Sequence, residues 1–256
     1  MLPTDDLIAH LMADEATAAV LQGARDDVDA VLWRRDVRSN AAAVAAASRA
    51  RGARDSAAID GADLAVVDDS PMGRVLAAAQ HVTAAAPGQA ETWGRAPLQV
   101  LAHLHALTAR GMVGEEDLGR PRGGDTADDP LNLGALPSDA TPVGPHLVRL
   151  ADWVSRSQDV PALVVAALVH AELMHLRPFT WGSGLVARAS VRCVLVARGL
   201  DPSMFTIPEL GMLEQGRGAY VAAIRGYASG DPTGLAASVR WFATAVGLGA
   251  RAVQVP

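Results

Sequence analysis

The sequence predicts an all-α protein, and three observations support that prediction. Alanine-rich stretches such as "AAAVAAASRARGARDSAAID" combine high helix propensity with few β-branched residues. Aromatic residues make up only 4% of the chain, although half of its residues are hydrophobic. Outside one loop region, no convincing pair of segments alternates apolar and polar residues with the period of two that marks β-strands. We therefore expect helices around a single core, which a chain of 256 residues can bury.

The spacing of alanine and leucine predicts each helix in turn. We expect N-terminal helices over 3–35 and 40–60, the second ended by Gly61, because glycine readily closes a helix. The later helices are expected at about 72–86, 96–110, 146–157, 160–175, 185–198, 213–227 and 232–248, with a turn around "GLDPSMF". Residues 118–145 are rich in Gly, Pro, Asp and Thr and predict a long loop, often a functional flap, or a short β-hairpin.

Composition excludes several classes of function. All 22 basic residues are arginine, so lysine-dependent phosphate loops, Schiff-base enzymes and kinases are excluded. The formal net charge of −6 argues against nucleic-acid binding. The single Cys193 lies in an apolar helical run and predicts a buried, inert thiol in a reducing cytoplasm. The apolar run that contains His170 and Glu172 is too short and too polar to span a membrane, and the N-terminus is unlike a secretory signal.

The stretch "HLRPFTWGSGLVAR" is the candidate binding site. Gly182, Ser183 and Gly184 allow backbone amides to crowd together just before a helix, an arrangement that favours phosphate or carboxylate. We expect Ser183 to be the N-cap of that helix, and Arg177 and Arg188 to add positive charge. These residues form the predicted anion cradle.

Two charged residues are placed against the dipoles of their predicted helices. Asp60 lies at a helix C-terminus, and Arg188 is expected in the first turn of its helix. Each placement costs about 0.3 to 1 kcal/mol at an exposed site. Either both side chains are solvated, or they meet each other or an anion.

Neither a metal site nor a nucleophile is supported by the motifs. His170 and His175 flank a glutamate in "HAELMH", but they are five residues apart, about 140° around a helix, whereas a zinc-binding pair needs a spacing of four. His103 and His105 are expected to be one surface and one core residue. Gly-x-Ser-x-Gly and Gly-x-Gly-x-x-Gly motifs at strand ends are absent, so a serine hydrolase and a dinucleotide oxidoreductase gain no support.

The segment 177–188, "RPFTWGSGLVAR", resembles the hallmark of the Fic (Fido) family, His-Pro-Phe-x-Asp/Glu-Gly-Asn-Gly-Arg-x-x-Arg. The matching residues are Pro178, Phe179, Gly182, Gly184 and Arg188. The stretches "ALVHAEL", "LAHLHALTARGMVGEEDLGRPR" and "GAYVAAIRGYASGDPTGLAASVRWF" are similar to neighbouring helices of that family. "SAAIDG" resembles its inhibitory Ser/Thr-x-x-x-Glu-Gly motif, with Ser56, Asp60 and Gly61 in the corresponding positions. The resemblance covers about 200 residues.

The resemblance implies AMP transfer from ATP to a target hydroxyl, but four functional positions differ. Arg177 replaces the histidine base, and arginine stays protonated near neutral pH, so it cannot accept the proton. Trp181 replaces the acidic residue that holds magnesium, Ser183 replaces the asparagine, and Leu185 replaces the first phosphate-binding arginine. His175 lies about 200° around the helix from that base position and is expected to point away.

We therefore expect a Fic-like helical fold that has lost AMP transfer and acts as an anion-binding, nucleotide-binding or protein-interaction module. The alternative is a transferase that uses a different phosphorylated or nucleotide donor. A nucleotide or phosphate anion is the expected ligand, with no metal, no nucleic acid and no membrane involved. A protein partner and a homodimer both remain open. Residues 1–90 are expected to carry the inhibitory-like motif and 91–256 the Fic-like core, together forming one compact body.

Overall fold

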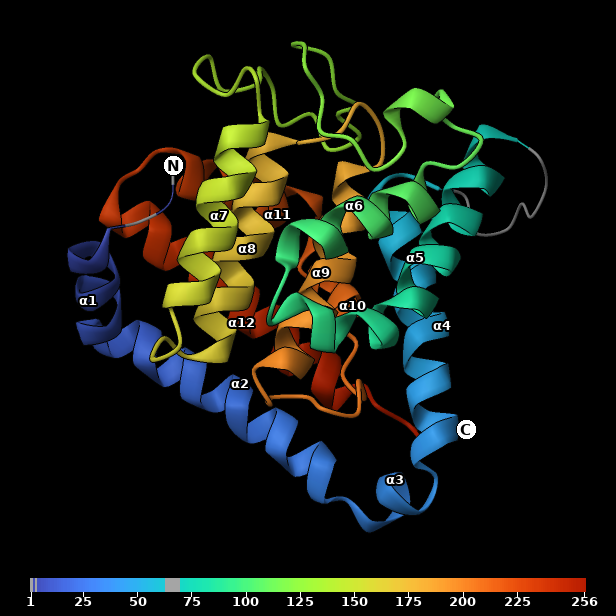
Figure 1. The fold of residues 1–256 in the computed structure, drawn as a ribbon. Coiled ribbons are helices and arrows are strands. Elements are labelled where there is room, and N and C mark those ends of the chain that lie inside the picture. Colours follow the sequence, from blue (N-terminus) through green and yellow to red (C-terminus); the bar gives the residue numbers. More distant parts are fainter. Residues whose placement is uncertain (1, 3, 63–69) are drawn as a thin grey trace.

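The computed structural model describes residues 2, 4–62 and 70–256, and these residues form helices joined by loops (Figure 1). The helices are α1 (Asp5–Ala13), α2 (Glu15–Trp33), α3 (Arg35–Ser39), α4 (Ala41–Ile59), α5 (Pro71–Trp93), α6 (Pro97–Thr108), η1 (Glu115–Asp117), α7 (Gly144–Arg156), α8 (Ala162–Leu176), α9 (Ser183–Ala197), α10 (Pro208–Glu214), α11 (Gly216–Ala228) and α12 (Pro232–Arg251). Over these residues the only β-type pairing is an isolated bridge between Arg110 and Val113. The predicted all-α class is confirmed.

The N-terminal region is more interrupted than predicted. The single helix expected over 3–35 is wrong, because the chain breaks at Asp14 and again at Arg34. The carboxylate of Asp14 accepts the Thr17 backbone N–H at 3.0 Å and so caps the start of α2. The polar cap satisfies the amides at the break, which allows α1 and α2 to point in different directions.

Two later predictions also need correction. The helix expected to stop near 86 continues to Trp93 and passes through Pro87. Ala86, Ala90 and Trp93 are buried along one face, so their packing outweighs the hydrogen bond that an internal proline removes. The short helix α10 was not predicted, and it begins at Pro208, a residue favoured in the first turn because its ring fixes φ.

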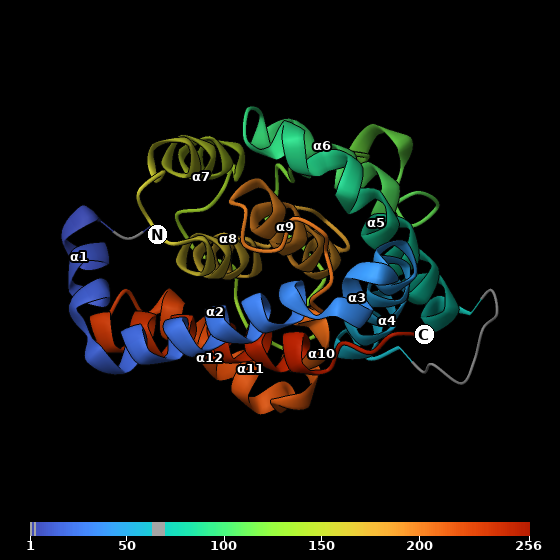
Figure 2. The same ribbon diagram turned by 90° about the horizontal axis from the view of Figure 1, so that it is seen from below.

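Helices α8 and α9 form the centre of the molecule. Helix α9 packs against α5 and α8, while α12 packs against α2, α10 and α11. Figure 2 shows α2 and α12 side by side along one edge, with α8 and α9 between them and the pair α6 and α7. Almost every residue of α8 and α9 is buried, and α8 is accordingly apolar on nearly all sides, whereas α9 also buries Arg188 and Arg192. The N-terminal helix α4 packs on α5 and α10.

A long loop, residues 109–143, connects α6 to α7 and is called the flap loop below. It lies at the top of Figure 1, beside the turn that joins α8 to α9. Apart from the short helix η1, the flap loop has no regular structure, so the long-loop prediction holds and the hairpin does not form. Its position places it over the predicted cradle.

The end of α4 is fixed by a glycine turn. Gly61 adopts a φ of 89°, its N–H donates to Ala58 O, and the Ala62 N–H donates to Ala57 O. These two hydrogen bonds form a Schellman motif, which closes a helix where one residue takes a left-handed conformation. Glycine adopts that conformation at no steric cost. The predicted stop is confirmed, and Asp60 is left as the capping residue.

Two further expectations can be compared with the structure. No helix among the described residues is both long enough and apolar enough to cross a membrane. Cys193 is a buried free thiol, and burial raises its pKa to about 12. The thiol therefore stays protonated at neutral pH and is the inert core residue that was predicted.

Candidate functional site

The turn between α8 and α9 is built by two residues in left-handed backbone conformations. Arg177 ends α8 at a φ of 41°, and Gly182 begins α9 as its N-cap at a φ of 77°. Between them, Phe179 is buried and stacks on His105 of α6, with ring centroids 3.9 Å apart. A Cβ atom on Gly182 would lie 2.9 Å from Thr108 Cγ2. Glycine is therefore required at this position by both its φ and its close approach to α6.

Ser183 is not the N-cap that was predicted. It is the first residue inside α9, and its Oγ accepts the Phe179 N–H at 3.0 Å and donates to Phe179 O at 3.2 Å. Because Gly182 can adopt the left-handed conformation, the cap moves one residue earlier. The Ser183 hydroxyl then closes the turn instead of binding the helix amides.

Arg188 lies in the second turn of α9, not in the first as predicted, because α9 starts at Ser183. Its side chain is fully buried and has four hydrogen-bond acceptors. Nε donates to Ser56 Oγ at 2.7 Å, and Nη2 donates to Ser56 O at 3.2 Å and to Asp60 Oδ2 at 2.6 Å. Nη1 lies 3.5 Å from the Tyr220 hydroxyl. Burial lowers the pKa of Arg188, but the Asp60 charge and the Tyr220 hydroxyl outweigh it and raise the pKa overall.

The predicted meeting of Asp60 and Arg188 is confirmed. The side chain of Asp60 is 7% exposed and that of Arg188 is 0% exposed, so the ion pair is shielded from water. Ser56 and Asp60 are one turn apart on α4, which brings both onto the same guanidinium. A Cβ atom on Gly184 would lie 3.1 Å from Arg188 Nη1 and 3.3 Å from Asp60 Oδ1. Glycine at 184 thus lets α4 and α9 approach closely enough for aspartate to reach directly.

The other predicted site residues lie in the same region but make different contacts. Arg177 Nη1 lies 3.0 Å from Asp129 Oδ2, and its Nη2 donates to Gly134 O at 2.6 Å, so the flap loop holds this guanidinium. Trp181 is partly buried against the hydrophobic core. Leu185 is 1% exposed and contributes an apolar wall beside the cradle.

The flap loop brings a carboxylate to the cradle that sequence reasoning missed. Asp128 Oδ2 accepts the Gly182 N–H at 3.0 Å, at the N-terminus of α9. Burial raises the pKa of Asp128 to about 6, against the effect of the Gly182 amide, and the negative charge of Asp60 adds to the rise. The positive charges of Arg177 and Arg188 oppose it. An acidic residue in a long polar loop gives no signal of this contact, because only the folded path of the loop creates it.

A buried polar chain lies behind Arg188. His170 Nε2 lies 2.6 Å from the Tyr220 hydroxyl, which in turn reaches Arg188. Burial, together with the charge of Arg188, lowers the pKa of His170 to about 3, so the ring is neutral at pH 7. His170 is thus a structural hydrogen-bonding residue. Tyr220 was not among the predicted site residues, although it lies in a stretch already noted for its resemblance.

His175 points away from the cradle, as expected. It packs edge-on against Tyr227, with centroids 6.2 Å apart, and lines a separate cavity of about 450 Å³ with His146 and Arg149. His105 is buried and His103 is exposed, which confirms the division predicted for that pair. None of the histidines described here lies at position 177, where the family motif has its catalytic base.

Buried polar atoms without a hydrogen-bond partner are concentrated at this turn. Across the described residues six such side-chain atoms occur, and five belong to the segment 177–188 or to residues that contact it. They are Asp60 Oδ1, His105 Nε2, Asp128 Oδ1, Arg177 Nε and Thr180 Oγ1, while the sixth is Trp241 Nε1. Because buried polar groups in folded proteins are normally partnered, such a cluster marks a place suited to a polar ligand.

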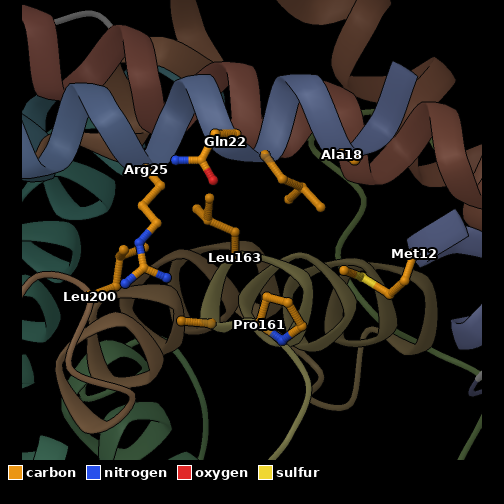
Figure 3. Close-up of a pocket in the computed structure, with 9 residues that line it drawn as sticks. Met12, Ala18, Gln22, Arg25, Pro161, Leu163 and Leu200 are labelled. Atoms are coloured by element: carbon orange, nitrogen blue, oxygen red, sulfur yellow. The ribbon is translucent and has the colours of Figure 1, made fainter. Parts of the chain in front are cut away.

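An apolar cavity of about 230 Å³ lies elsewhere, between α2 and the start of α8. Figure 3 shows Gln22 and Arg25 of α2 facing Leu163 and Leu200 across it. None of its lining residues belongs to the segment 177–188. It offers no cluster of charged groups comparable with that at the cradle.

The sequence and the structure were compared with those of known proteins, and only the structure shows a similarity. The sequence matches no model of a protein family and no curated protein sequence. The structure is similar to the crystal structure of a Fic family protein from Desulfovibrio desulfuricans G20, with a TM-score of 0.66 and 20% identity over 97% of this chain and 74% of that chain. It is also similar to Fic-1 from C. elegans, with a TM-score of 0.64 and 16% identity over 94% of this chain and 72% of that chain. The chain therefore has the fold of Fic family proteins.

Proposed function

We propose that this protein is a Fic-fold binding module that does not transfer AMP and whose cradle takes an oxyanion, such as a phosphate or the phosphate group of a nucleotide. The observation that carries the proposal is the presence of two unpartnered buried donors at the turn, Arg177 Nε and Thr180 Oγ1. The unpartnered oxygens of Asp60 and Asp128 are acceptors that would repel an oxyanion, so these carboxylates must move aside for it to bind. Glycine amides at the start of α9 and the guanidinium of Arg188 supply the donors that an oxyanion needs. The proposal includes a regulatory function, in which a protein partner controls access to the cradle.

The position of the general base supports the loss of AMP transfer. Arg177 stands there, and its guanidinium is held by Asp129 and Gly134 O instead of facing an incoming hydroxyl. A guanidinium has no lone pair available to accept a proton near neutral pH. The contacts to Asp129 and Gly134 O also hold the Arg177 side chain against the flap loop.

The residues present do not fit a magnesium-bound nucleotide in the usual Fic manner. Trp181 replaces the acidic metal ligand, and Leu185 places an apolar, buried side chain where a phosphate-binding arginine stands in the family motif. Over the described chain, no group of three or more His, Cys, Asp or Glu side chains is arranged to hold a metal ion.

Two measurements test the proposal. Incubation with magnesium ATP should leave the intact mass unchanged by mass spectrometry, and an adduct that Arg177→Ala abolishes would contradict the loss of transfer. A thermal-shift screen with phosphate, nucleotides and phosphorylated metabolites should raise the melting temperature equally with and without magnesium, because a ligand of the native state stabilises it. A shift that depends on magnesium would contradict an oxyanion site without metal.

A second candidate is a transferase that uses another phosphorylated or nucleotide donor. Retention of Gly182, Gly184 and Arg188 favours it, because these residues could still hold a donor phosphate once the contacts to Asp60 and Asp128 open. Incubation with unlabelled sugar nucleotides, followed by intact-mass measurement, distinguishes this candidate by a covalent adduct. The binding-module proposal requires none.

A further inference from the structure

The flap loop runs beside the turn between α8 and α9 and contacts it through the backbone. The Arg122 N–H donates to Pro178 O at 2.8 Å, and the Asp128 N–H donates to Thr180 O at 2.9 Å. Two backbone hydrogen bonds therefore hold the loop beside the motif. They place the Asp128 side chain at the first amide of the cradle, Gly182 N.

Buried arginine contacts support the same path. Arg122 is 3% exposed and donates to Arg177 O at 2.9 Å and to Leu176 O at 3.0 Å, two carbonyls at the end of α8 that have no partner within the helix. It also donates to Gly124 O within the loop. A cation at a helix C-terminus is favoured by the helix dipole as well as by these bonds. Arg122 therefore anchors the loop on one side of Asp128.

On the other side of Asp128, the loop is held by three more arginines. Asp129 pairs with Arg177, as described above. From α11, Arg217 donates to Pro130 O, and Arg225 donates to Asn132 O at 3.1 Å. These last two contacts are exposed, so they add little to stability and can be exchanged with water. The segment around Asp128 is thus anchored at Arg122 on one side and, beyond the exposed contacts at Pro130 and Asn132, by the bond from Arg177 to Gly134 O on the other.

The two halves of the cradle are each occupied by a carboxylate of the chain itself. Asp60 from α4 takes the guanidinium of Arg188, and Asp128 from the flap loop takes the amide of Gly182. Both carboxylates keep one buried oxygen without a partner, so neither is as well bonded as a carboxylate can be. An oxyanion that supplied more acceptors to the same donors would compete with them.

From this geometry we infer that Asp128 is a tethered anion that occupies the cradle and that an oxyanion ligand binds by displacing it and releasing the flap loop from the segment 178–180. The inference rests on the proposed function of the cradle as an oxyanion site. It assigns the flap loop a regulatory role, because ligand binding and loop opening become one linked equilibrium. A loop segment released in this way is a surface that a partner can recognise only when the ligand is bound.

The decisive experiment combines hydrogen exchange with ligand titration in the full chain. Asp128→Ala removes the tethered carboxylate, and Asp125→Ala is the matched control, because Asp125 lies in the same loop and bonds the exposed Thr141 hydroxyl instead. Without ligand, the amide of residue 128, which donates to Thr180 O, should exchange at least about tenfold faster in Asp128→Ala than in the wild type or the control, whereas the Arg122 amide should stay protected by the buried contacts of its own side chain. Unchanged exchange would show that Asp128 does not hold the loop and would overturn the inference, whatever the cradle binds.

Inorganic phosphate and acetate then serve as probes. Their binding is measured by NMR from the shifts of the amide resonances of residues 182–184. Asp128→Ala should bind at least one probe about tenfold more tightly than the wild type, since the competing internal anion is gone. In the wild type, the bound probe should speed exchange of the Asp128 amide, which donates to Thr180 O, an effect that a merely structural aspartate does not predict. Tighter binding of phosphate alone or of acetate alone identifies the source of the oxyanion.

The failures of the two proposals are distinguishable. Equal affinity in the wild type and Asp128→Ala, with exchange unaffected by the probe, overturns the displacement inference and leaves the oxyanion site standing. The double variant Asp60→Asn, Asp128→Ala should bind at least one of the two probes. If neither probe binds it, the proposed oxyanion site is wrong, and the displacement inference falls with it.

Discussion

The carboxylate of Asp60 and the guanidinium of Arg188 form a buried ion pair that joins α4 to α9, with Asp60 Oδ2 and Arg188 Nη2 2.6 Å apart. Burial of two charges is costly, and the attraction between them compensates only when further hydrogen bonds complete the site. Ser56 and the Tyr220 hydroxyl supply those bonds to Arg188. The pair therefore depends on its surroundings, and removal of one partner leaves the other charge buried without its ion-pair partner.

Breaking this pair should cost far more than breaking a surface pair. Arg188→Ala strands Asp60, and we expect a loss of about 3 to 5 kcal/mol in the free energy of unfolding, whereas an exposed pair would cost under about 1 kcal/mol. Asp60→Ala should also destabilise the fold, but it should tighten phosphate binding because Arg188 is freed. Denaturant unfolding of both single variants and the double variant measures the coupling. A coupling energy near zero, or phosphate binding that weakens in Asp60→Ala, would contradict the prediction.

The close approach at Gly184 gives a second prediction. A methyl group there would lie 3.1 Å from Arg188 Nη1 and 3.3 Å from Asp60 Oδ1, so Gly184→Ala should shift these side chains and weaken the pair, at a cost of about 1 to 3 kcal/mol despite the better helix propensity of alanine. Gly218→Ala is the matched control, because Gly218 is also helical and a methyl group there would meet no neighbouring atom within 4 Å. The control should be neutral or stabilise by up to about 1 kcal/mol. Thermal denaturation compares the two, and equal melting temperatures would show that the pair tolerates the methyl group.

The pair was predictable from the sequence because three local features coincided. Asp60 follows a helix and precedes Gly61, Arg188 follows the glycine cradle, and the two segments resemble motifs that occur together in one family. Helix ends and dipoles are set by nearby residues, so their consequences can be inferred without a fold. The exact turn of Arg188 was missed, because Gly182 and not Ser183 caps α9.

The remaining contacts depend on the path of the chain in three dimensions. Asp128 reaches Gly182 only because the flap loop runs beside residues 178–180, and a loop without periodic pattern carries no local signal of its path. Tyr220 meets Arg188 across α9 and α11 for a similar reason. The continuation of α5 through Pro87 is another tertiary effect, because buried side chains on both sides of the proline hold the helix together.

His105 should make stability depend on pH. Burial lowers its pKa to about 4, so the folded protein binds a proton less readily than the unfolded chain between about pH 6.5 and 4. The contribution of neutral His105 is complete above pH 6.5 and is lost as pH falls through that window, to a total on the order of 3 kcal/mol. Unfolding free energies of the wild type and His105→Gln, measured between pH 7 and 4, should differ in slope. A parallel pair of curves for the wild type and His105→Gln would contradict the assignment.

The two internal carboxylates should also be coupled to each other. The negative charge of Asp60 raises the pKa of Asp128, whereas Arg177 and Arg188 lower it. Asp60→Asn removes the like charge and leaves Arg188 without its neutralising partner, so both changes should move the pKa of Asp128 down from about 6. Burial, the largest cause of the shift, still raises the pKa of Asp128 in this variant. Carbon-13 NMR titration of labelled aspartate carboxyl groups measures the change directly.

The same coupling has a consequence for stability. A raised pKa means that the folded state binds the Asp128 proton more readily than the unfolded chain, so the stability that this group contributes is complete below about pH 4 and is lost as pH rises through about 6. In Asp60→Asn this loss of stability should be smaller and should end at a lower pH. In the control Asp125→Asn, the pKa of Asp128 should equal that in the wild type. An unchanged or higher pKa of Asp128 in Asp60→Asn would show that the two carboxylates do not sense each other and that the cradle is not shared between them.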